Sequence, residues 1–527
     1  MRPDPVELVA QLEARIKPLE IAAAHAWWDA ANFVSDETEA RRVAADVALR
    51  DALADPEAFA AIRDAREQRD LDPLVARQLD VLFDGFAPQQ VPAALRTRIV
   101  ELEAQVEGTF NAFRGDLDGT PVDDNEIAKI LRASDDGDLR RRAWEASKQV
   151  GAQVAELVRE LARLRNEAAR TLGFRDHFEL ALATGELDED RLMATLDEVD
   201  RVTREPFTRW KVEVDERRAT RFGCSVAALG PWHYDDPFFQ DPPGGDDVDL
   251  DPLFADADVE ALTLRTYDGI GLDIRPALGR SDLLPRDAKS QHAFCIDVDR
   301  EGDVRVLCNI VPNERWVETM LHEFGHAVYD LGVRRDLPWL LRTMHPLTTE
   351  GVAMLFGRLP RDPRWLAGVA GLDDGRVDTL RDGLARMQRG ALLVFARWVL
   401  VMTNFERGLY ADPDADHDTR WWDLVERYQQ VPRPAGRRAP DWAAKIHLAA
   451  APVYYQNYLY GEMVASQLDA TLHARAGGLV GRPEAGALLA DRFFGPGTSM
   501  RWDRLVEHAT GEPLTPRHFA AQLASPA

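Results

Sequence analysis

Cysteine is scarce in this chain of 527 residues, which contains only Cys224, Cys295 and Cys308. Three scattered cysteines are too few for a disulfide framework or for a zinc site built from thiolates. Cys295 and Cys308 fall on neighbouring predicted strands and could form one bridge, but buried thiols are the expected state. The length of the chain is instead sufficient for a large apolar core.

Long apolar runs and an excess of basic residues are also missing. No run of about 18 uncharged apolar residues occurs, so we predict no membrane-spanning helix. The N-terminus shows no apolar signal core, so we expect a cytoplasmic location. The formal net charge of −26 argues against a nucleic-acid partner, since phosphate binding requires basic patches.

Helical periodicity dominates the sequence. Apolar residues recur at spacings of three and four, and we find no internal repeat. The pattern predicts helices over residues 6–115, 125–172, 190–220, 314–331, from 348 to before 360, 376–410, 421–430 and 443–473.

Two other segments interrupt the helical pattern. The stretch 241–258 is rich in Asp, Pro and Gly, which predicts a loop and a candidate internal boundary. Residues 291–298 and 304–311 alternate apolar and polar side chains around a turn, which predicts a β-hairpin. The fold class is therefore mainly α with one small sheet.

One motif carries the strongest functional signal, Leu321-His322-Glu323-Phe324-Gly325-His326-Ala327. Two histidines four apart on a helix share one face, because four residues make just over one turn. Such a pair can bind one divalent ion, and the glutamate between them then lies against a water on that ion. This is the H-E-x-x-H pattern of zinc metallopeptidases.

A catalytic zinc site needs a third protein ligand and leaves its fourth position to water. Glu350 is the leading candidate, at the start of the next predicted helix. Its alternative role is a first-turn carboxylate stabilised by the helix dipole. His345 is a rival ligand, but Pro346 follows it and indicates a loop. With zinc bound, Glu323 is expected to accept a proton from the attacking water and deliver it to the leaving amine.

The segment from Gln291 to about Gln467 resembles the angiotensin-converting-enzyme family of peptidyl dipeptidases, family M2. A looser similarity links it to the thimet oligopeptidase family, M3. Both families bind zinc through two histidines and one glutamate. The blocks that carry the resemblance are His292-Ala293, His322-Glu323-Phe324-Gly325-His326, Leu337-Pro338-Trp339-Leu340-Leu341-Arg342, Glu350, Trp421-Trp422-Asp423-Leu424, Tyr428-Gln429, Lys445-Ile446-His447, and Tyr455 with Tyr458.

The resemblance implies one Zn²⁺ per chain, held by His322, His326 and Glu350, with Glu323 as the general base. It also implies roles for residues outside the motif. Tyr458 and His447 would stabilise the oxyanion, His292 and Ala293 would bind the substrate backbone, and Lys445 with Tyr455 would hold a C-terminal carboxylate.

Helix geometry also assigns the tyrosines a role without reference to the family resemblance. Tyrosines three apart face the same side of a helix, and a phenol can donate to an oxyanion without adding a charge. The alternative is that Tyr454, Tyr455, Tyr458 and Tyr460 are core aromatics whose hydroxyls have partners.

The chain departs from the M2 pattern at several positions. The spacing from His447 to the tyrosines is one residue longer, so Tyr454 competes with Tyr455 as the carboxylate-binding residue. Asn457 matches the family's chloride-linked arginine, which argues against chloride activation. Met354 matches the family's aspartate behind the zinc histidines, so the sequence does not identify the residue that orients them from that side. The first 230 residues resemble the family only faintly.

The resemblance implies a two-lobed helical ellipsoid with a deep cleft and a small antiparallel sheet beside the zinc helix. We expect a single metallopeptidase domain over residues 1–527, with lid or cleft-wall helices in 1–115, a helical lobe in 116–260 and the zinc- and substrate-binding core in 261–527. The predicted function is zinc-dependent hydrolysis of short peptides with release of C-terminal dipeptides. The alternatives are an endo-acting oligopeptidase of the M3 type and an inactive peptide-binding pseudoenzyme.

Overall fold

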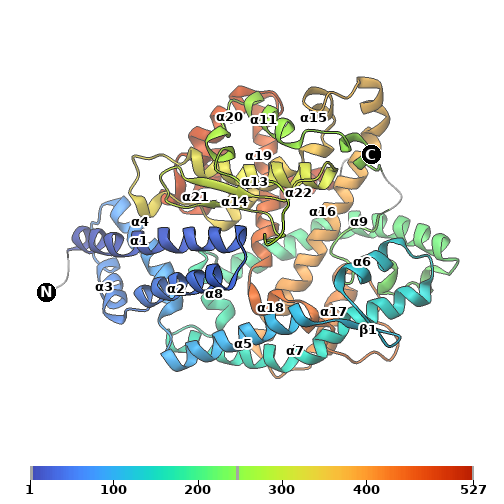
Figure 1. The fold of residues 1–527 in the computed structure, drawn as a ribbon, viewed down its shortest axis with the longest axis horizontal. Coiled ribbons are helices and arrows are strands. Elements are labelled where there is room, and N and C mark those ends of the chain that lie inside the picture. The colour runs from blue at the N-terminus through green and yellow to red at the C-terminus, as the bar shows by residue number, and fades with distance from the viewer. Residues whose placement is uncertain (1–3, 245–247, 525–527) are drawn as a thin grey trace. The chain divides into compact units, whose positions relative to one another are not determined.

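The computed structural model describes residues 4–244 and 248–524. Most of these residues are helical, and two antiparallel two-stranded sheets complete the regular structure (Figure 1). The prediction of a mainly α protein is confirmed, although it included one sheet rather than two. The two-lobed shape and deep cleft implied by the resemblance stay predictions. None of the described helices combines the length and apolar character needed to cross a membrane.

The chain forms two compact units, and each contains segments that are far apart in the sequence. Unit 1 comprises Met1–Gln90, Val248–Ala385 and Tyr460–Phe519. Unit 2 comprises Val91–Asp247, Arg386–Leu459 and Ala520–Ala527. One division falls inside the acidic stretch 241–258, where the sequence predicted an internal boundary. The single domain and its three predicted parts stay predictions.

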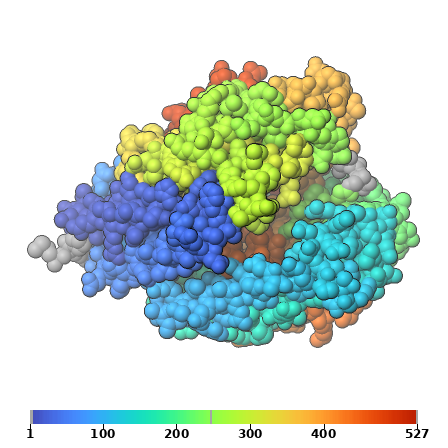
Figure 2. Space-filling model, in the orientation of Figure 1, coloured from blue at the N-terminus to red at the C-terminus, as the bar shows by residue number. Residues whose placement is uncertain are grey.

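Unit 1 begins with four helices: α1 (Pro5–Asn32), α2 (Asp36–Leu53), α3 (Pro56–Arg66) and α4 (Pro73–Phe86). Each start follows from a local cap, because the residue before it accepts a hydrogen bond from a first-turn N–H. The four helices bury a shared apolar cluster that includes Leu12, Ile62 and Phe86. Trp27 of α1 packs on Phe294, with ring centroids 4.2 Å apart, and the surfaces of the two segments adjoin in Figure 2.

The centre of unit 1 contains a hairpin and the helix that carries the H-E-x-x-H motif. Strands β3 (Phe294–Asp297) and β4 (Val304–Leu307) pair antiparallel, with Phe294 opposite Leu307. The hairpin is confirmed but is shorter than predicted. Helix α13 (Glu314–Gly332) starts where expected, because the Asn313 side chain accepts a hydrogen bond from the Trp316 N–H at 2.9 Å.

The second helix of this centre is α14 (Pro346–Gly357), which starts two residues earlier than predicted. The remaining α-helices wholly within unit 1 are short. They are α10 (Asp251–Phe254), α11 (Val259–Gly269), α12 (Arg275–Leu278), α15 (Pro363–Gly368), α20 (Pro483–Leu489) and α21 (Trp502–Thr510). Three helices cross a division between the units: α16 (Asp374–Ala411), α19 (Tyr455–Ala476) and α22 (Pro516–Ala524).

Unit 2 is built around two long helices, α7 (Gly137–Thr171) and α9 (Glu189–Phe222). Its other α-helices are α5 (Ala93–Ala112), α6 (Asp124–Ala133), α8 (His177–Thr184), α17 (His417–Gln429) and α18 (His447–Ala450). The long helical region predicted over 125–172 consists of two helices, α6 and α7. The carboxylate of Asp136 accepts hydrogen bonds from the N–H groups of Asp138 and Leu139, which makes it the cap of a new helix.

A second hairpin in unit 2 corrects the prediction of one small sheet. Strands β1 (Gly115–Leu117) and β2 (Thr120–Val122) pair antiparallel. Their two-residue turn consists of Asp118 and Gly119, with φ of 56° and 85°. An Asp-Gly pair in this conformation is a strong hairpin signal, which the strand periodicity of such short segments did not reveal. The three cysteines are free in this structure, as expected, but only Cys308 is buried, whereas Cys224 and Cys295 are half-buried.

Candidate metal centre

His322, His326 and Glu350 converge in unit 1. The two imidazoles project from α13 and the carboxylate from α14, and one ligand atom of each lies within 4.8 Å of the other two. His322 Nε2 and Glu350 Oε2 are 3.7 Å apart. The structure therefore brings together the three residues that the sequence singled out as ligands.

Close helix packing sets this geometry. Gly325 lies between the two histidines, and a Cβ at that position would be only 2.8 Å from the Ala353 Cα of α14. On the other side, a Cβ at Gly461 of α19 would be 3.1 Å from the Glu350 Cβ. Helix α14 is thus held closely between two neighbours that carry glycine at the contact, which fixes where the Glu350 carboxylate lies.

The electrostatics of the group suit a cation. Burial lowers the pKa of His322 to about 4, and burial together with His322 lowers the pKa of His326 well below its usual value. Both rings are therefore neutral at pH 7, with lone pairs available for a metal. Burial raises the pKa of Glu350 to about 7. Two imidazoles and one carboxylate are a donor set that zinc accepts, so the residues fit the ion that the motif implies.

Glu323 lies on α13 between the two histidines and is 8% exposed. Burial, and then the charge of Glu350, raise the pKa of Glu323 to about 8, while a hydrogen bond from the Cys295 backbone N–H opposes the shift. The carboxyl group is thus held against strand β3. A carboxyl with a pKa near neutrality can both accept and return a proton.

Thr349 contacts His326, which the sequence did not indicate. Its Oγ1 lies 2.5 Å from Nδ1 of His326. It directly precedes Glu350 on α14, so one turn of this helix supplies both a metal ligand and a partner for another. Met354, which matches the family's aspartate, instead packs on α19: its sulfur would lie 3.2 Å from a Cβ at Gly461.

His345, the rival third ligand, has a different role in the structure. It is the N-cap of α14, and its Nδ1 accepts a hydrogen bond from the Leu347 N–H at 3.3 Å. The expected loop at Pro346 is therefore the first turn of a helix, in which proline is favoured because its missing N–H is not needed.

His292 and Ala293 lie just before strand β3 rather than on it. His292 is exposed, and its backbone N–H donates to the Ser290 hydroxyl at 3.3 Å. Within the described residues, no hydrogen bond or ion pair engages its imidazole. The structure therefore leaves this side chain available but does not bring it into contact with the metal group.

The predicted carboxylate anchor lies in unit 2. Lys445 is half-buried, and its ammonium donates to Gln240 Oε1 at 2.8 Å. Burial lowers the pKa of Lys445 to about 8, although Asp236 and Asp241 oppose the shift. No carboxylate oxygen of the described residues lies within 4 Å of this ammonium. Gln240 was missed because it is far from Lys445 in the sequence and only the fold joins them.

His447 and the tyrosines lie near Lys445. The rings of His447 and Tyr455 are 5.0 Å apart, and the Lys445 ammonium is 5.9 Å from the Tyr455 ring. Burial and the charge of Lys445 lower the pKa of His447 to about 4, so its ring is neutral. Tyr455 is buried, whereas Tyr454 and Tyr458 are half-buried, with their rings 5.1 Å apart. Exposure therefore favours Tyr454 over Tyr455 as a residue that a ligand can reach.

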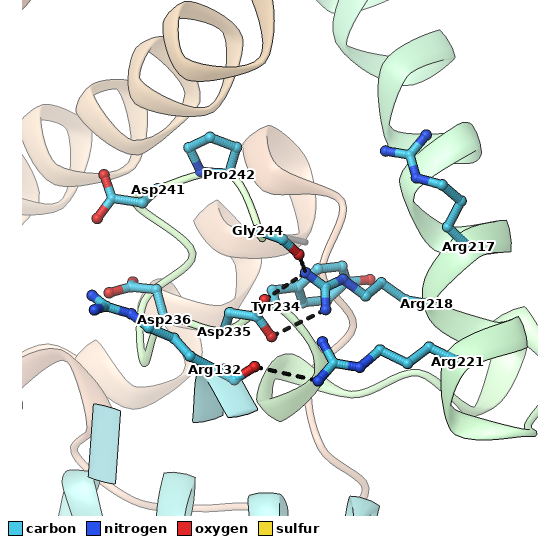
Figure 3. A pocket seen from close by; sticks show the side chains of 10 residues that line it. All are labelled: Arg132, Arg217, Arg218, Arg221, Tyr234, Asp235, Asp236, Asp241, Pro242 and Gly244. Atoms are coloured by element: carbon cyan, nitrogen blue, oxygen red, sulfur yellow. Dashed lines mark hydrogen bonds and ion pairs between the residues drawn. The ribbon is translucent and has the colours of Figure 1, made fainter. Parts of the chain in front are cut away.

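A cavity of about 630 Å³ lies elsewhere in unit 2 (Figure 3). Four arginines and three aspartates line it, and none of the predicted site residues does. Arg218 donates to the Asp235 carboxylate at 2.5 Å and Arg221 to the Asp135 carboxylate at 2.8 Å. Much of the charge around this cavity is therefore balanced within the protein.

The fold and the three converging side chains define a class: a mainly helical protein with a His-His-Glu group consistent with a bound metal ion. Two family models match the chain, and both describe peptidases. The model described as Peptidase family M3 matches residues 275–525, which contain the whole group. The model described as Angiotensin-converting enzyme, Peptidase M2, matches residues 4–205. The resemblance to M2 and M3 metallopeptidases is confirmed. No curated protein matches the chain.

The two matches are distributed differently from what the sequence motifs suggested. The motifs placed the M2 likeness in residues 291–467 and left the first 230 residues only faintly similar. The M2 model instead matches the N-terminal part, while the M3 model covers the segment with the H-E-x-x-H motif. The N-terminal helices therefore carry family information that their helical periodicity alone did not reveal.

Proposed function

We propose that the protein is a zinc-dependent peptidase of short peptides, in which His322, His326 and Glu350 hold the ion. The observation that carries the proposal is the convergence of their ligand atoms within 4.8 Å, inside the segment matched by the M3 family model. A zinc ion bound there supplies a water of lowered pKa and polarises the peptide carbonyl.

Glu323 acts as base and then as acid in this proposal. Its carboxyl takes a proton as water attacks the peptide carbonyl and returns it to the leaving amine. Its pKa near neutrality supports this role, because such a group can both take up and return a proton. The hydrogen bond from the Cys295 N–H orients the carboxyl, and the low exposure of Glu323 keeps bulk water from competing.

Lys445 supports a preference for peptides with a free C-terminus. A half-buried ammonium whose hydrogen-bond partner is a neutral amide gains more from a carboxylate, since two opposite charges attract strongly where water is partly excluded. A substrate held by its C-terminal carboxylate would be cleaved at a fixed distance from that end, which favours release of dipeptides. Tyr455, or Tyr454 in its place, would share the anchor.

The remaining site residues complete the proposal. Tyr458 and His447 donate hydrogen bonds to the oxyanion that forms when water attacks the carbonyl. Both can do so as neutral groups, which adds no buried charge. His292 and Ala293 bind the substrate backbone next to strand β3, where an extended peptide can align with the hairpin.

A second candidate is an endo-acting oligopeptidase. The observation that favours it is the match of the M3 family model to residues 275–525, which include both the metal group and Lys445. This candidate uses the same zinc chemistry but does not need a C-terminal anchor.

The first experiment tests the zinc chemistry. We expect the purified protein to contain one zinc ion per chain and to hydrolyse short peptides. Glu323→Gln should keep the metal and lose turnover, whereas Glu318→Gln, on the same helix but paired with Arg361, should keep both. Persistent turnover in Glu323→Gln would show that the base is another residue, and absence of a bound metal would reject the proposal.

The second experiment separates the two candidates. A peptide with a C-terminal carboxylate is compared with its amide, and products are identified by mass spectrometry. For a dipeptidase, the acid should be preferred by about 10- to 150-fold in kcat/KM, since a hydrogen bond to a charged group contributes about 1.5–3 kcal/mol. Lys445→Met should remove this preference. Equal cleavage of both peptides by the unsubstituted enzyme would favour the oligopeptidase.

A further inference from the structure

The metal-binding histidines differ in what supports them. Among residues 4–244 and 248–524, Thr349 provides the only hydrogen bond to either imidazole from outside the His-His-Glu group. The bond joins the threonine Oγ1 to His326 Nδ1 at 2.5 Å, whereas His322 Nε2 lies 3.7 Å from Glu350 Oε2, beyond hydrogen-bond distance. The position from which the related family supplies a carboxylate is occupied by Met354, which packs on α19.

The geometry of α14 makes Thr349 a rigid support. Its backbone N–H donates to the His345 carbonyl at 3.1 Å, so it belongs to the first turn of the helix. A threonine in a helix has two favoured χ1 rotamers, and the hydrogen bond to His326 selects the one that points the hydroxyl at the ring. Because Glu350 is the next residue, any movement of this turn displaces a ligand and the partner of another ligand together.

We propose that Thr349 is a positioning residue: its hydroxyl accepts the Nδ1–H of His326 and so directs the Nε2 lone pair of that ring at the metal. This inference rests on the proposed function. A neutral imidazole carries one N–H, and the partner of that N–H decides which nitrogen is free to bind a metal. With Nδ1 engaged by the hydroxyl, Nε2 is the atom left for the ion.

A hydroxyl differs from the more usual carboxylate partner in one respect. It satisfies the N–H without adding a further negative charge to a site that already contains the carboxyl groups of Glu323 and Glu350, which are costly to bury in charged form. Thr349 therefore orients His326 without adding to the charge that the bound ion must offset.

The test compares hydroxyl and methyl at one position. Thr349→Val keeps the shape and removes the hydroxyl, and Thr349→Ser restores it. Thr348→Val is the matched control, because this neighbouring hydroxyl donates to the His345 carbonyl at 2.9 Å and does not contact the histidines of the metal group. Zinc affinity is measured on the full chain by competition with a chelator, and the visible spectrum of the Co²⁺-substituted protein reports the ligand geometry.

We expect Thr349→Val to weaken zinc binding by about 10- to 100-fold and to change the Co²⁺ spectrum. Thr349→Ser and Thr348→Val should bind zinc within about threefold of the unsubstituted chain. If Thr349→Val does not fold, Thr349→Ala takes its place in the comparison. Wild-type affinity in the variant without the hydroxyl, or failure of serine to restore it, would overturn the role of Thr349 and leave the peptidase proposal intact. Failure of the unsubstituted chain to bind zinc would overturn both.

Discussion

The contact between α13 and α14 at Gly325 allows a prediction about both stability and metal binding. A Cβ added there would lie 2.8 Å from Ala353 Cα and 3.3 Å from Ala353 N, both backbone atoms that cannot rotate away. In Gly325→Ala the two helices must therefore separate. The histidines lie on α13 and Glu350 lies on α14, so separating the helices also increases the distance between the Glu350 carboxylate and the two imidazoles.

Two opposing effects set the size of the change. Replacing glycine by alanine inside a helix alone stabilises by about 0.5–1 kcal/mol, because alanine loses less backbone entropy on folding. Overpacking a tight contact costs about 1–3 kcal/mol. The cost of overpacking should exceed the gain from replacing glycine. We therefore expect Gly325→Ala to lower the free energy of unfolding by about 1–2 kcal/mol and zinc affinity by at least about tenfold.

The assay is urea unfolding followed by tryptophan fluorescence, together with zinc titration. Gly85→Ala is the matched control, because Gly85 lies within α4 and a Cβ added there would have no heavy atom within 4 Å. This control should gain about 0.5–1 kcal/mol. The reasoning would be refuted if Gly325→Ala gained stability as Gly85→Ala does and bound zinc with unchanged affinity.

Three further predictions concern unit 2. The pKa of about 8 for Lys445 means that its ammonium is present below pH 8 and lost above it, so KM for a C-terminal acid should rise above pH 8 while KM for the amide stays flat. Lys148 is buried with a pKa lowered from 10.5 to about 7, so the unfolded chain binds one more proton between these values and stability rises with pH across that window. Lys148→Met should stabilise the protein near pH 6 and flatten this rise in urea unfolding; parallel pH profiles would contradict it. Val453 has φ of 54° but is buried, so Val453→Gly removes about 1–2 kcal/mol of left-handed strain and also a buried side chain that contributes about 1.5–3 kcal/mol. We therefore expect a net loss of about 1 kcal/mol; a higher unfolding midpoint in urea would contradict it.

The parts of the fold that depend on local sequence could be predicted closely. Asn313 caps α13 through a bond to a residue three positions away, so the start of the motif helix follows from the sequence. The break between α6 and α7 has the same kind of local cause at Asp136, but the continuous apolar pattern on either side obscured it. The hairpin at Asp118 and Gly119 has a clear turn signal and strands too short to show a period.

The parts of the site that depend on tertiary packing could not be predicted. Gln240 and Lys445 are joined by a hydrogen bond across 205 positions of the chain. Thr349 meets His326 only because glycine allows α13 and α14 to approach closely. A threonine before a glutamate has no distinguishing pattern, so neither Gln240 nor Thr349 could be assigned a role before the helices were placed.

The two groups on which the proposed function depends have opposite electrostatic needs. The metal group contains two carboxyls with raised pKa values and two neutral imidazoles, so its burial is costly until a cation binds. Lys445 is a half-buried cation with a lowered pKa, so its partial burial is costly until an anion binds. In the proposed function, a metal ion and a peptide that ends in a carboxylate would supply these two charges. The zinc chemistry needs only the first group, which both candidate functions share. The cost of burying Lys445 therefore distinguishes the dipeptidase, because an oligopeptidase that cleaves far from the C-terminus would leave that cost without compensation.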